Sequence, residues 1–163
     1  MELYNLSMAG FREIVLVGID LSSYGKDLGL RLIDAILAAC TTDGIERVRL
    51  GSLEPDLFSD EDYQLLATLP QFCPQFHLSL QSGCDATLKR MNRHYDSAFY
   101  KDLVNRIRAT FDNAAITTDI MVGFAGESDE DFKTSLEFMQ EIAFEKVHVF
   151  PYSVRKGTRA EKL

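Results

Sequence analysis

The stretch AITTDIMVGF, residues 115–124, decides the fold because it is almost entirely apolar or β-branched and ends in a glycine turn. A run of this length and composition predicts a strand that is buried in a parallel sheet. Four other segments have the same character and are predicted strands too. They are REIVLVGID at 12–20, RVRLGSLEP at 47–55, QFHLSLQSG at 75–83 and KVHVFPYS at 146–153.

Segments with apolar residues at helical spacing separate these strands, which predicts four helices. The predicted helices span 30–40, 60–69, 97–111 and 128–142. Ser128 is a suitable N-cap for the last of them because Asp131 follows three residues later. The opening MELYNLSMAG has the pattern of the last turns of a further helix. Strands that alternate with helices predict βαβ units and a parallel sheet, so the fold class is α/β. No linker divides residues 1–163.

Two architectures agree with this alternation. One is a complete flavodoxin-like sheet with strand order 2-1-3-4-5. The other is a piece of a partial (βα) barrel, since a closed eightfold barrel takes about 250 residues and eight strands.

Polar side chains fall on one face of the predicted sheet, because side chains alternate along a strand. The opposite face, with Phe76, Leu78 and Leu80, is expected to meet the helices. The polar set comprises Asp20, Arg49, His77, Ser79, Gln81, Asp119, His148 and Tyr152. A flat sheet with helices on both faces would bury these groups, so the pattern favours a curved sheet around a polar, ligand-holding lumen. Ligands of α/β folds lie at the carboxyl ends of the strands, where Asp20, Gln81 and Gly123 are expected.

Composition excludes several kinds of function. The formal net charge of −8 argues against binding DNA or RNA through bulk electrostatics. No apolar run is long enough to cross a membrane, and the N-terminus lacks a signal peptide pattern. Cys40, Cys73 and Cys84 have no CxxC spacing, so no metal site is predicted from them and a reduced, cytoplasmic protein is expected.

Five segments in order resemble the radical S-adenosylmethionine methylthiotransferases, and most closely the MtaB-type subgroup that modifies threonylcarbamoyladenosine in tRNA. They are EIVLVGIDLSSYGKD at 13–27, RVRLGSLEPD at 47–56, HLSLQSGCDATLKRMNRHY at 77–95, ITTDIMVGFAGESDEDF at 116–132 and HVFPYSVRKGTRA at 148–160. The resemblance covers nearly the whole chain. One departure is Ala125, where the family has proline in GFPGE; this change should loosen the turn modestly.

The resemblance implies a radical SAM partial barrel of which about five parallel strands are present and the first strand is missing. It also implies S-adenosylmethionine and a [4Fe-4S] cluster as cofactors of the full-length protein. The family's CxxxCxxC motif occurs nowhere in this sequence. We therefore expect a truncated core, without the cluster-binding loop, the N-terminal cluster domain or the C-terminal RNA-binding domain, that holds no cluster and is inactive alone. tRNA would be bound through those other parts.

The family's S-adenosylmethionine site carries over to eleven positions, although no catalytic residue can be assigned. Gly18 and Asp20 would meet the amino group, and Arg93 the carboxylate. The remaining positions are Ser79 and Gln81 near the ribose, Met121, Val122 and Gly123 near the adenine, Phe150 and Tyr152 beside it, and Asp119 on the lumen face.

The resemblance implies that the parent enzyme installs a methylthio group on C2 of a hypermodified adenosine beside the anticodon. Two alternatives within the same chemistry are an isopentenyladenosine tRNA enzyme and a ribosomal-protein methylthiotransferase. A different class is a non-catalytic βα module that binds a nucleotide.

Overall fold

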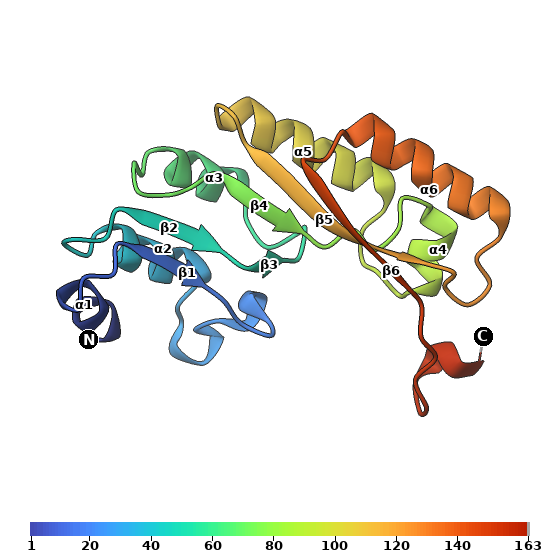
Figure 1. The fold of residues 1–163 in the computed structure, drawn as a ribbon, viewed down its shortest axis with the longest axis horizontal. Helices are drawn as coiled ribbons and strands as arrows, with labels where there is room; N and C mark the ends of the chain where they lie inside the picture. Colours follow the sequence, from blue (N-terminus) through green and yellow to red (C-terminus); the bar gives the residue numbers. More distant parts are fainter. Residues whose placement is uncertain (163) are drawn as a thin grey trace.

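Six strands run parallel and pair in chain order in the computed structural model, which describes residues 1–162 (Figure 1). β1 and β2 form a two-stranded sheet, and β3 to β6 form a four-stranded sheet. The strands are β1 (Glu13–Leu16), β2 (Arg47–Leu50), β3 (Ser52–Leu53), β4 (Gln75–Leu78), β5 (Ala115–Val122) and β6 (Lys146–Pro151).

The strand order contains no switch point, because within each of the two sheets every strand pairs with its neighbour in sequence. The flavodoxin-like order was therefore the wrong alternative. A sequential parallel order with βα connections is that of a partial barrel, which confirms the other prediction.

The predicted strand at 47–55 is divided at Gly51. β2 pairs with β1, whereas β3 pairs with β4. The Gly51 N–H donates to the Leu16 carbonyl at 2.8 Å and so ends the first ladder. A Cβ at Gly51 would lie 3.2 Å from the Val17 side chain, so the missing side chain lets the two segments approach closely where the strand changes partner.

All four predicted helices are present, within two residues of the predicted ends. They are α2 (Leu32–Cys40), α3 (Asp60–Ala67), α5 (Ser97–Thr110) and α6 (Asp129–Ile142). α1 (Glu2–Met8) matches the helical pattern at the N-terminus. α4 (Asp85–Arg90) was not predicted, since six residues are too few to show a helical period. None of the described helices is long and apolar enough to span a membrane.

Capping at the start of α6 follows the predicted pattern. The Asp131 N–H donates to Ser128 Oγ at 3.1 Å, and Asp131 Oδ2 accepts from the Ser128 N–H at 3.1 Å. These reciprocal bonds satisfy two N–H groups that a helix start leaves without partners.

The core lies between the sheet and the helices on one of its faces. Figure 1 shows α3, α5 and α6 on the same side of β4 and β5. Phe76 and Leu78 of β4 point to this side and are fully buried, as predicted. An aromatic cluster of Tyr63, Phe72, Phe76 and Phe111 fills the space under α3 and α5. The opposite face of the sheet, which carries the polar residues, is left for the site.

Candidate functional site

A cavity of about 840 Å³ lies at the carboxyl ends of the strands. Its walls come from the segments that follow β1, β3, β4 and β5 and from the C-terminal turn. It is lined by Asp20, Ser22, Glu54, Asp56, Gln81, Lys89, Arg90, Met91, Asn92, Arg93, His94, Tyr95, Met121, Phe124, Arg159 and Ala160. This edge is where parallel α/β proteins bind their ligands.

One wall of the cavity is acidic. Asp20 begins the short 3-10 helix Leu21–Ser23 and accepts hydrogen bonds from the Ser22 N–H and from the hydroxyls of Ser22 and Ser23. These bonds, led by that of the Ser22 hydroxyl, hold the pKa of Asp20 below its usual value. Glu54 and Asp56 follow β3 on the same wall. This wall therefore suits a cationic group such as an ammonium.

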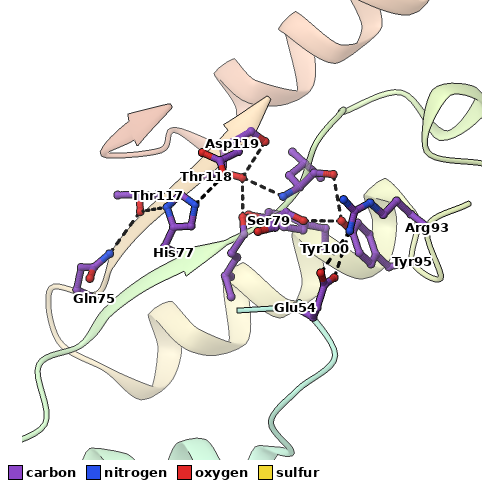
Figure 2. Close-up of polar contacts among 12 residues, drawn as sticks. Glu54, Gln75, His77, Ser79, Arg93, Tyr95, Tyr100, Thr117, Thr118 and Asp119 are labelled. Carbon is purple, nitrogen blue, oxygen red and sulfur yellow. Dashed lines mark hydrogen bonds and ion pairs between the residues drawn. The ribbon is translucent and has the colours of Figure 1, made fainter. Parts of the chain in front are cut away.

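Most of the basic side chains of the cavity come from α4 and the turn after it. Arg90 Nη2 donates to Thr87 Oγ1 at 2.9 Å, within α4, and to Asp131 Oδ2 at 2.7 Å, in α6. The bond to Asp131 connects α4 to α6. Arg93 Nη1 instead lies 3.4 Å from each carboxylate oxygen of Glu54 (Figure 2). Arg93 is thus held loosely across the cavity and can exchange Glu54 for a ligand carboxylate.

The floor of the cavity is formed where β4 ends against β5. Gln81 has a left-handed backbone, with φ of +71°, which is uncommon for a residue with a side chain. Its N–H donates to the Asp119 carbonyl, and its carbonyl accepts from the Met121 N–H, both at 2.9 Å. The two bonds keep Gln81 and Met121 together despite the turn in the chain, and both line the cavity.

Tyr95 supports this floor from the side of the helices. Its hydroxyl donates to the carbonyls of Ser79 and Leu80, the latter at 3.1 Å. Burial raises the pKa of Tyr95 to about 12. The end of β4 is therefore tied to the turn that carries Arg93.

Four of the eleven predicted site residues line the cavity together: Asp20, Gln81, Arg93 and Met121. Seven lie outside its lining: Gly18, Ser79, Asp119, Val122, Gly123, Phe150 and Tyr152. Val122 and Tyr152 are near it, since the Tyr152 N–H donates to the Val122 carbonyl at 2.8 Å. The Tyr152 ring centroid lies 4.9 Å from that of Phe124, which does line the cavity.

Asp119 lies on the lumen face two residues before Met121, beside His77 and Thr117 (Figure 2). Ser79 is also on this face of the sheet, but its carbonyl is taken by Tyr95. His148 of β6 is next to His77, with ring centroids 5.8 Å apart. The predicted gathering of polar groups on one face is therefore found. Arg49 also lies opposite the buried Val48 and Leu50 on β2, where it pairs with Glu13 of β1 at 2.6 Å.

Sequence reasoning missed Glu54 and Asp56 as cavity residues. They follow β3 in the same way that Asp20 follows β1, so their place at a strand end was the available signal. Phe124 and Tyr95 were missed because their contribution depends on loops whose course no periodicity predicts.

Sequential parallel strands with a cavity of mixed charge at their carboxyl edge define a partial (βα) barrel. The model of the radical SAM superfamily matches residues 2–139, so the chain belongs to this family.

Curated relatives align with the chain over nearly its whole length. It is 40% identical to a tRNA-2-methylthio-N(6)-dimethylallyladenosine synthase of Clostridium botulinum and 39% identical to the threonylcarbamoyladenosine tRNA methylthiotransferase MtaB of Thermotoga maritima. Each alignment covers 99% of this chain but only 36% and 37% of the relative. The chain thus spans about a third of the length of these relatives.

Solved radical SAM enzymes share the fold. A radical S-adenosylmethionine methyltransferase from Kitasatospora setae superposes with a TM-score of 0.70 at 16% identity, covering 92% of this chain and 29% of that one. Coproporphyrinogen III oxidase from Escherichia coli superposes with a TM-score of 0.65 at 17% identity, covering 87% of this chain and 32% of that one. At such identities the likeness shows the fold alone.

The cavity fits the cofactor that gives the family its name. S-adenosylmethionine carries an ammonium, a carboxylate and an apolar base, and the cavity offers Asp20, Arg93 and the pair Met121 and Phe124. Near it, the buried Tyr152 hydroxyl has no hydrogen-bond partner within residues 1–162. The buried Nε of Arg90, which lines the cavity, also has no partner within residues 1–162. Buried polar groups without a partner call for an explanation, and a bound ligand is one.

The cysteines, by contrast, do not fit a [4Fe-4S] cluster, which takes three or four thiolates. Cys40 ends α2, Cys73 precedes β4, and Cys84 is buried and donates its thiol hydrogen to Asp131 at 3.3 Å. No group of three His, Cys, Asp or Glu side chains that could hold a metal occurs within residues 1–162.

Proposed function

We propose that this chain forms the S-adenosylmethionine-binding part of the radical core of a cytoplasmic tRNA methylthiotransferase. The full protein would install a methylthio group on C2 of a hypermodified adenosine beside the anticodon. The observation that carries the proposal is the cavity that both Asp20 and Arg93 line at the strand ends, in a chain about 40% identical to enzymes of this class.

In this proposal each wall of the cavity binds one part of the cofactor. Arg93 exchanges Glu54 for the methionine carboxylate, while Asp20 accepts hydrogen bonds from the ammonium. Met121 and Phe124 pack on the adenine, with Tyr152 behind Phe124. Gln81 points its amide at the ribose hydroxyls.

The backbone at Gly123 belongs to the same proposed site. Gly123 has φ of +71°, and a Cβ there would meet no atom within 4 Å. An open position of this kind lets a ligand approach the backbone after β5. Gly18 and Val122 are proposed to act in the same way, through backbone groups, and Ser79 and Phe150 to border the ligand.

When bound, S-adenosylmethionine and its cluster supply the radical chemistry that replaces the hydrogen on the adenosine C2. The part of this chain is to hold the cofactor in one orientation and to exclude water. We propose that cluster binding and tRNA recognition depend on parts of the full protein that correspond to the regions of the relatives outside the third that this chain matches. We expect the 163-residue chain alone to form no product.

Calorimetric titration of the chain with S-adenosylmethionine tests the cofactor site. Asp20→Asn and Arg93→Ala are each expected to weaken binding about tenfold or more, as loss of a charge-assisted hydrogen bond does. Lys101→Ala is the matched control, since Lys101 pairs with Glu141 and does not line the cavity. Equal binding by all variants would contradict the proposed site.

Nucleoside analysis of tRNA from a strain that lacks the gene tests the activity. Loss of the 2-methylthio form of threonylcarbamoyladenosine is expected. Loss of the 2-methylthio form of isopentenyladenosine would instead identify the protein as the isopentenyladenosine tRNA enzyme. Unchanged tRNA nucleosides would exclude tRNA as the substrate. In that case a change in the mass of a ribosomal protein would indicate the ribosomal-protein methylthiotransferase, and no change would favour a non-catalytic nucleotide-binding module.

A further inference from the structure

The segment that follows β6 concentrates positive charge in an otherwise acidic chain. Residues 155–162, RKGTRAEK, which we call the basic turn, contain four cationic residues and one acidic residue, Glu161. The four cationic residues are Arg155, Lys156, Arg159 and Lys162, and all of them are exposed. The whole chain has 17 Lys and Arg against 25 Asp and Glu. The basic turn is therefore a local cationic surface on a molecule of net negative charge.

The cations of the basic turn are not used inside the molecule. Within residues 1–162, none of their side chains makes an ion pair or donates a hydrogen bond. The arginines of β2 differ in this respect, because Arg47 and Arg49 both pair with Glu13. Binding of an external anion to the basic turn would therefore break no internal ion pair.

Glu161 shapes the basic turn and is bonded to backbone instead of to a cation. Its Oε2 accepts from the Gly157 N–H at 2.6 Å, and the Thr158 N–H donates to the Arg155 carbonyl at 3.3 Å. Gly157 has φ of +82°, and a type II turn requires a positive φ at this third position. Lys156 occupies the second position. The turn is thus held by its own hydrogen bonds, with Lys156 at its tip.

The basic turn borders the cavity. Arg159 and Ala160 are among the lining residues, and so is Lys89 of α4. Lys89 is exposed, and it too lacks an ion pair in the part of the chain that the structure describes. Figure 1 shows the turn beyond the carboxyl end of β6. Unpaired, solvent-exposed cations from two separate elements therefore lie at the edge of the same cavity.

We propose that the basic turn binds phosphate groups of the RNA strand whose nucleoside enters the cavity, with Lys156 and Arg159 as the main contacts. The proposal rests on the proposed function, in which an adenosine of tRNA reaches this cavity. A nucleotide within a strand has a phosphate on each side, so a base that enters the cavity brings these anions to its edge. Lys and Arg are common side-chain donors to phosphate. The contact adds to the tRNA recognition proposed for other parts of the full protein.

Fluorescence anisotropy of the 163-residue chain tests this contact with a labelled single-stranded RNA of about ten nucleotides. The logarithm of the binding constant falls linearly with the logarithm of the salt concentration, with a slope of about 0.7 per phosphate contact on a single strand. Lys156→Ala is expected to weaken binding about threefold at low salt and to reduce the slope by about 0.7. The double variant Lys156→Ala/Arg159→Ala should weaken binding about tenfold and reduce the slope about twice as much.

Lys146→Ala is the matched control, because it removes the same charge from a different place. Lys146 is exposed, has no ion pair within residues 1–162 and begins β6, at the edge of the sheet opposite the cavity. The control should leave both the affinity and the slope unchanged. Equal effects of Lys146→Ala and Lys156→Ala would overturn the proposal, since only net charge would then matter. No RNA binding by the wild type would overturn it as well.

An acidic peptide is the other polyanion that the basic turn could bind, and the same assay separates it from RNA. A glutamate homopeptide of the same length as the RNA is expected to bind more weakly. If the peptide binds more tightly than the RNA and only the peptide responds to Lys156→Ala, the partner is an acidic protein segment and the RNA contact is wrong.

This proposal and the proposed function fail in different ways. If Arg93→Ala weakens S-adenosylmethionine binding while Lys156→Ala leaves RNA binding unchanged, the cofactor site stands and the RNA contact is wrong. If RNA binding depends on Lys156 but tRNA nucleosides are unchanged in a strain that lacks the gene, the RNA contact stands and the proposed modification of tRNA is wrong.

Discussion

Arg93 and Glu54 meet across the cavity, with Arg93 Nη1 3.4 Å from both carboxylate oxygens (Figure 2). The side chain of Arg93 is 27% exposed and that of Glu54 is 47% exposed, so water screens the pair. An ion pair of this length and exposure is worth less than about 1 kcal/mol. A ligand carboxylate can therefore replace Glu54 at little cost.

Glu54→Gln is expected to raise the affinity for S-adenosylmethionine about twofold to fivefold, because it removes the competitor for the guanidinium. Calorimetric titration of the wild type and the variant measures this. Glu61→Gln is a suitable control, since Glu61 is exposed in the first turn of α3 and does not line the cavity. Weaker binding by Glu54→Gln would instead mean that Glu54 itself contacts the ligand.

Asp131 should make stability depend on pH. Its pKa is held well below the usual 3.8 by the hydrogen bond from the Ser128 N–H, then by those from Arg90 and the Cys84 thiol. A depressed pKa contributes stability above the unfolded value, and the contribution is lost as pH falls through the folded value. We expect Asp131→Asn to lower the Tm at pH 7, with the difference from wild type shrinking below about pH 4.

Thermal unfolding followed by circular dichroism between pH 3 and pH 7 checks this. Asp129→Asn, in the same first helical turn, is the control, because no side-chain bond of Asp129 is found in the described chain. A Tm difference that persists unchanged at pH 3 would contradict the assignment.

Gly83→Ala is expected to destabilise the fold by about 1 to 3 kcal/mol, the usual range for overpacking. A Cβ at Gly83 would lie 2.8 Å from Cβ of Phe138 and 2.9 Å from the Ser135 carbonyl oxygen, both on α6. Denaturant unfolding gives the change in free energy. Gly18→Ala is the comparison, since the Cβ there would meet the Leu21 side chain at 3.0 Å and backbone only at 3.9 Å. Equal stability of the two variants would argue against close packing of the segment after β4 on α6.

Tyr95→Phe is expected to cost about 1 kcal/mol or slightly more, because it removes the donor to the Ser79 and Leu80 carbonyls. Tyr24→Phe is the matched control, since Tyr24 is exposed. Denaturant unfolding of both variants measures the difference. No loss in Tyr95→Phe would show that the end of β4 is held by the ladder with β5 alone.

Alkaline titration of tyrosine absorbance gives an independent check of burial. Tyr95 should ionise near pH 12, and Tyr63 and Tyr100 higher still, because burial raises the pKa of all three. The raised pKa of Tyr95 means that its contribution to stability is complete below about pH 10 and is lost as pH rises to about 12. Ionisation of all tyrosines near pH 10 in the folded protein would contradict it.

Iron analysis after anaerobic reconstitution of the chain with iron and sulfide tests the role of the cysteines. We expect little bound iron, since Cys40 and Cys84 are buried in different elements. A stoichiometric cluster would mean that the thiols rearrange, and Cys73→Ser would then be expected to remove it.

Much of the fold could be predicted from the sequence because period-2 and period-3.6 patterns are strong here. The alternation of Phe76, His77 and Leu78 predicted which face of β4 meets the helices, and it does so. The division at Gly51 was not predicted, although the sequence carries a signal for it. The apolar positions change phase across the glycine, from Val48 and Leu50 to Leu53, which a single strand with alternating faces would not show. The pairing partners on each side confirm the division.

The site was predictable where a residue lies at or shortly after the carboxyl end of a strand. Asp20, Gln81 and Met121 are of this kind, and all three line the cavity. Tyr95, by contrast, lies in the turn after α4. Its hydroxyl donates to the carbonyl of Ser79, next to the end of β4, because the chain folds back at this turn. Such contacts depend on tertiary structure and leave no periodic trace in the sequence.

The join at Gly51 means that two separate ladders build one cavity. Asp20 and Ser22 follow a strand of the two-stranded sheet, whereas Glu54, Asp56, Gln81 and Met121 belong to strands, or to segments after strands, of the four-stranded sheet. Beside the join, the hydrogen bonds of Val48 with Gln71 and Cys73 connect β2 to the segment that leads into β4. The position of Asp20 relative to the rest of the cavity therefore depends on how the two ladders meet, and a substitution at the join could change the shape of the cavity without touching a residue that lines it.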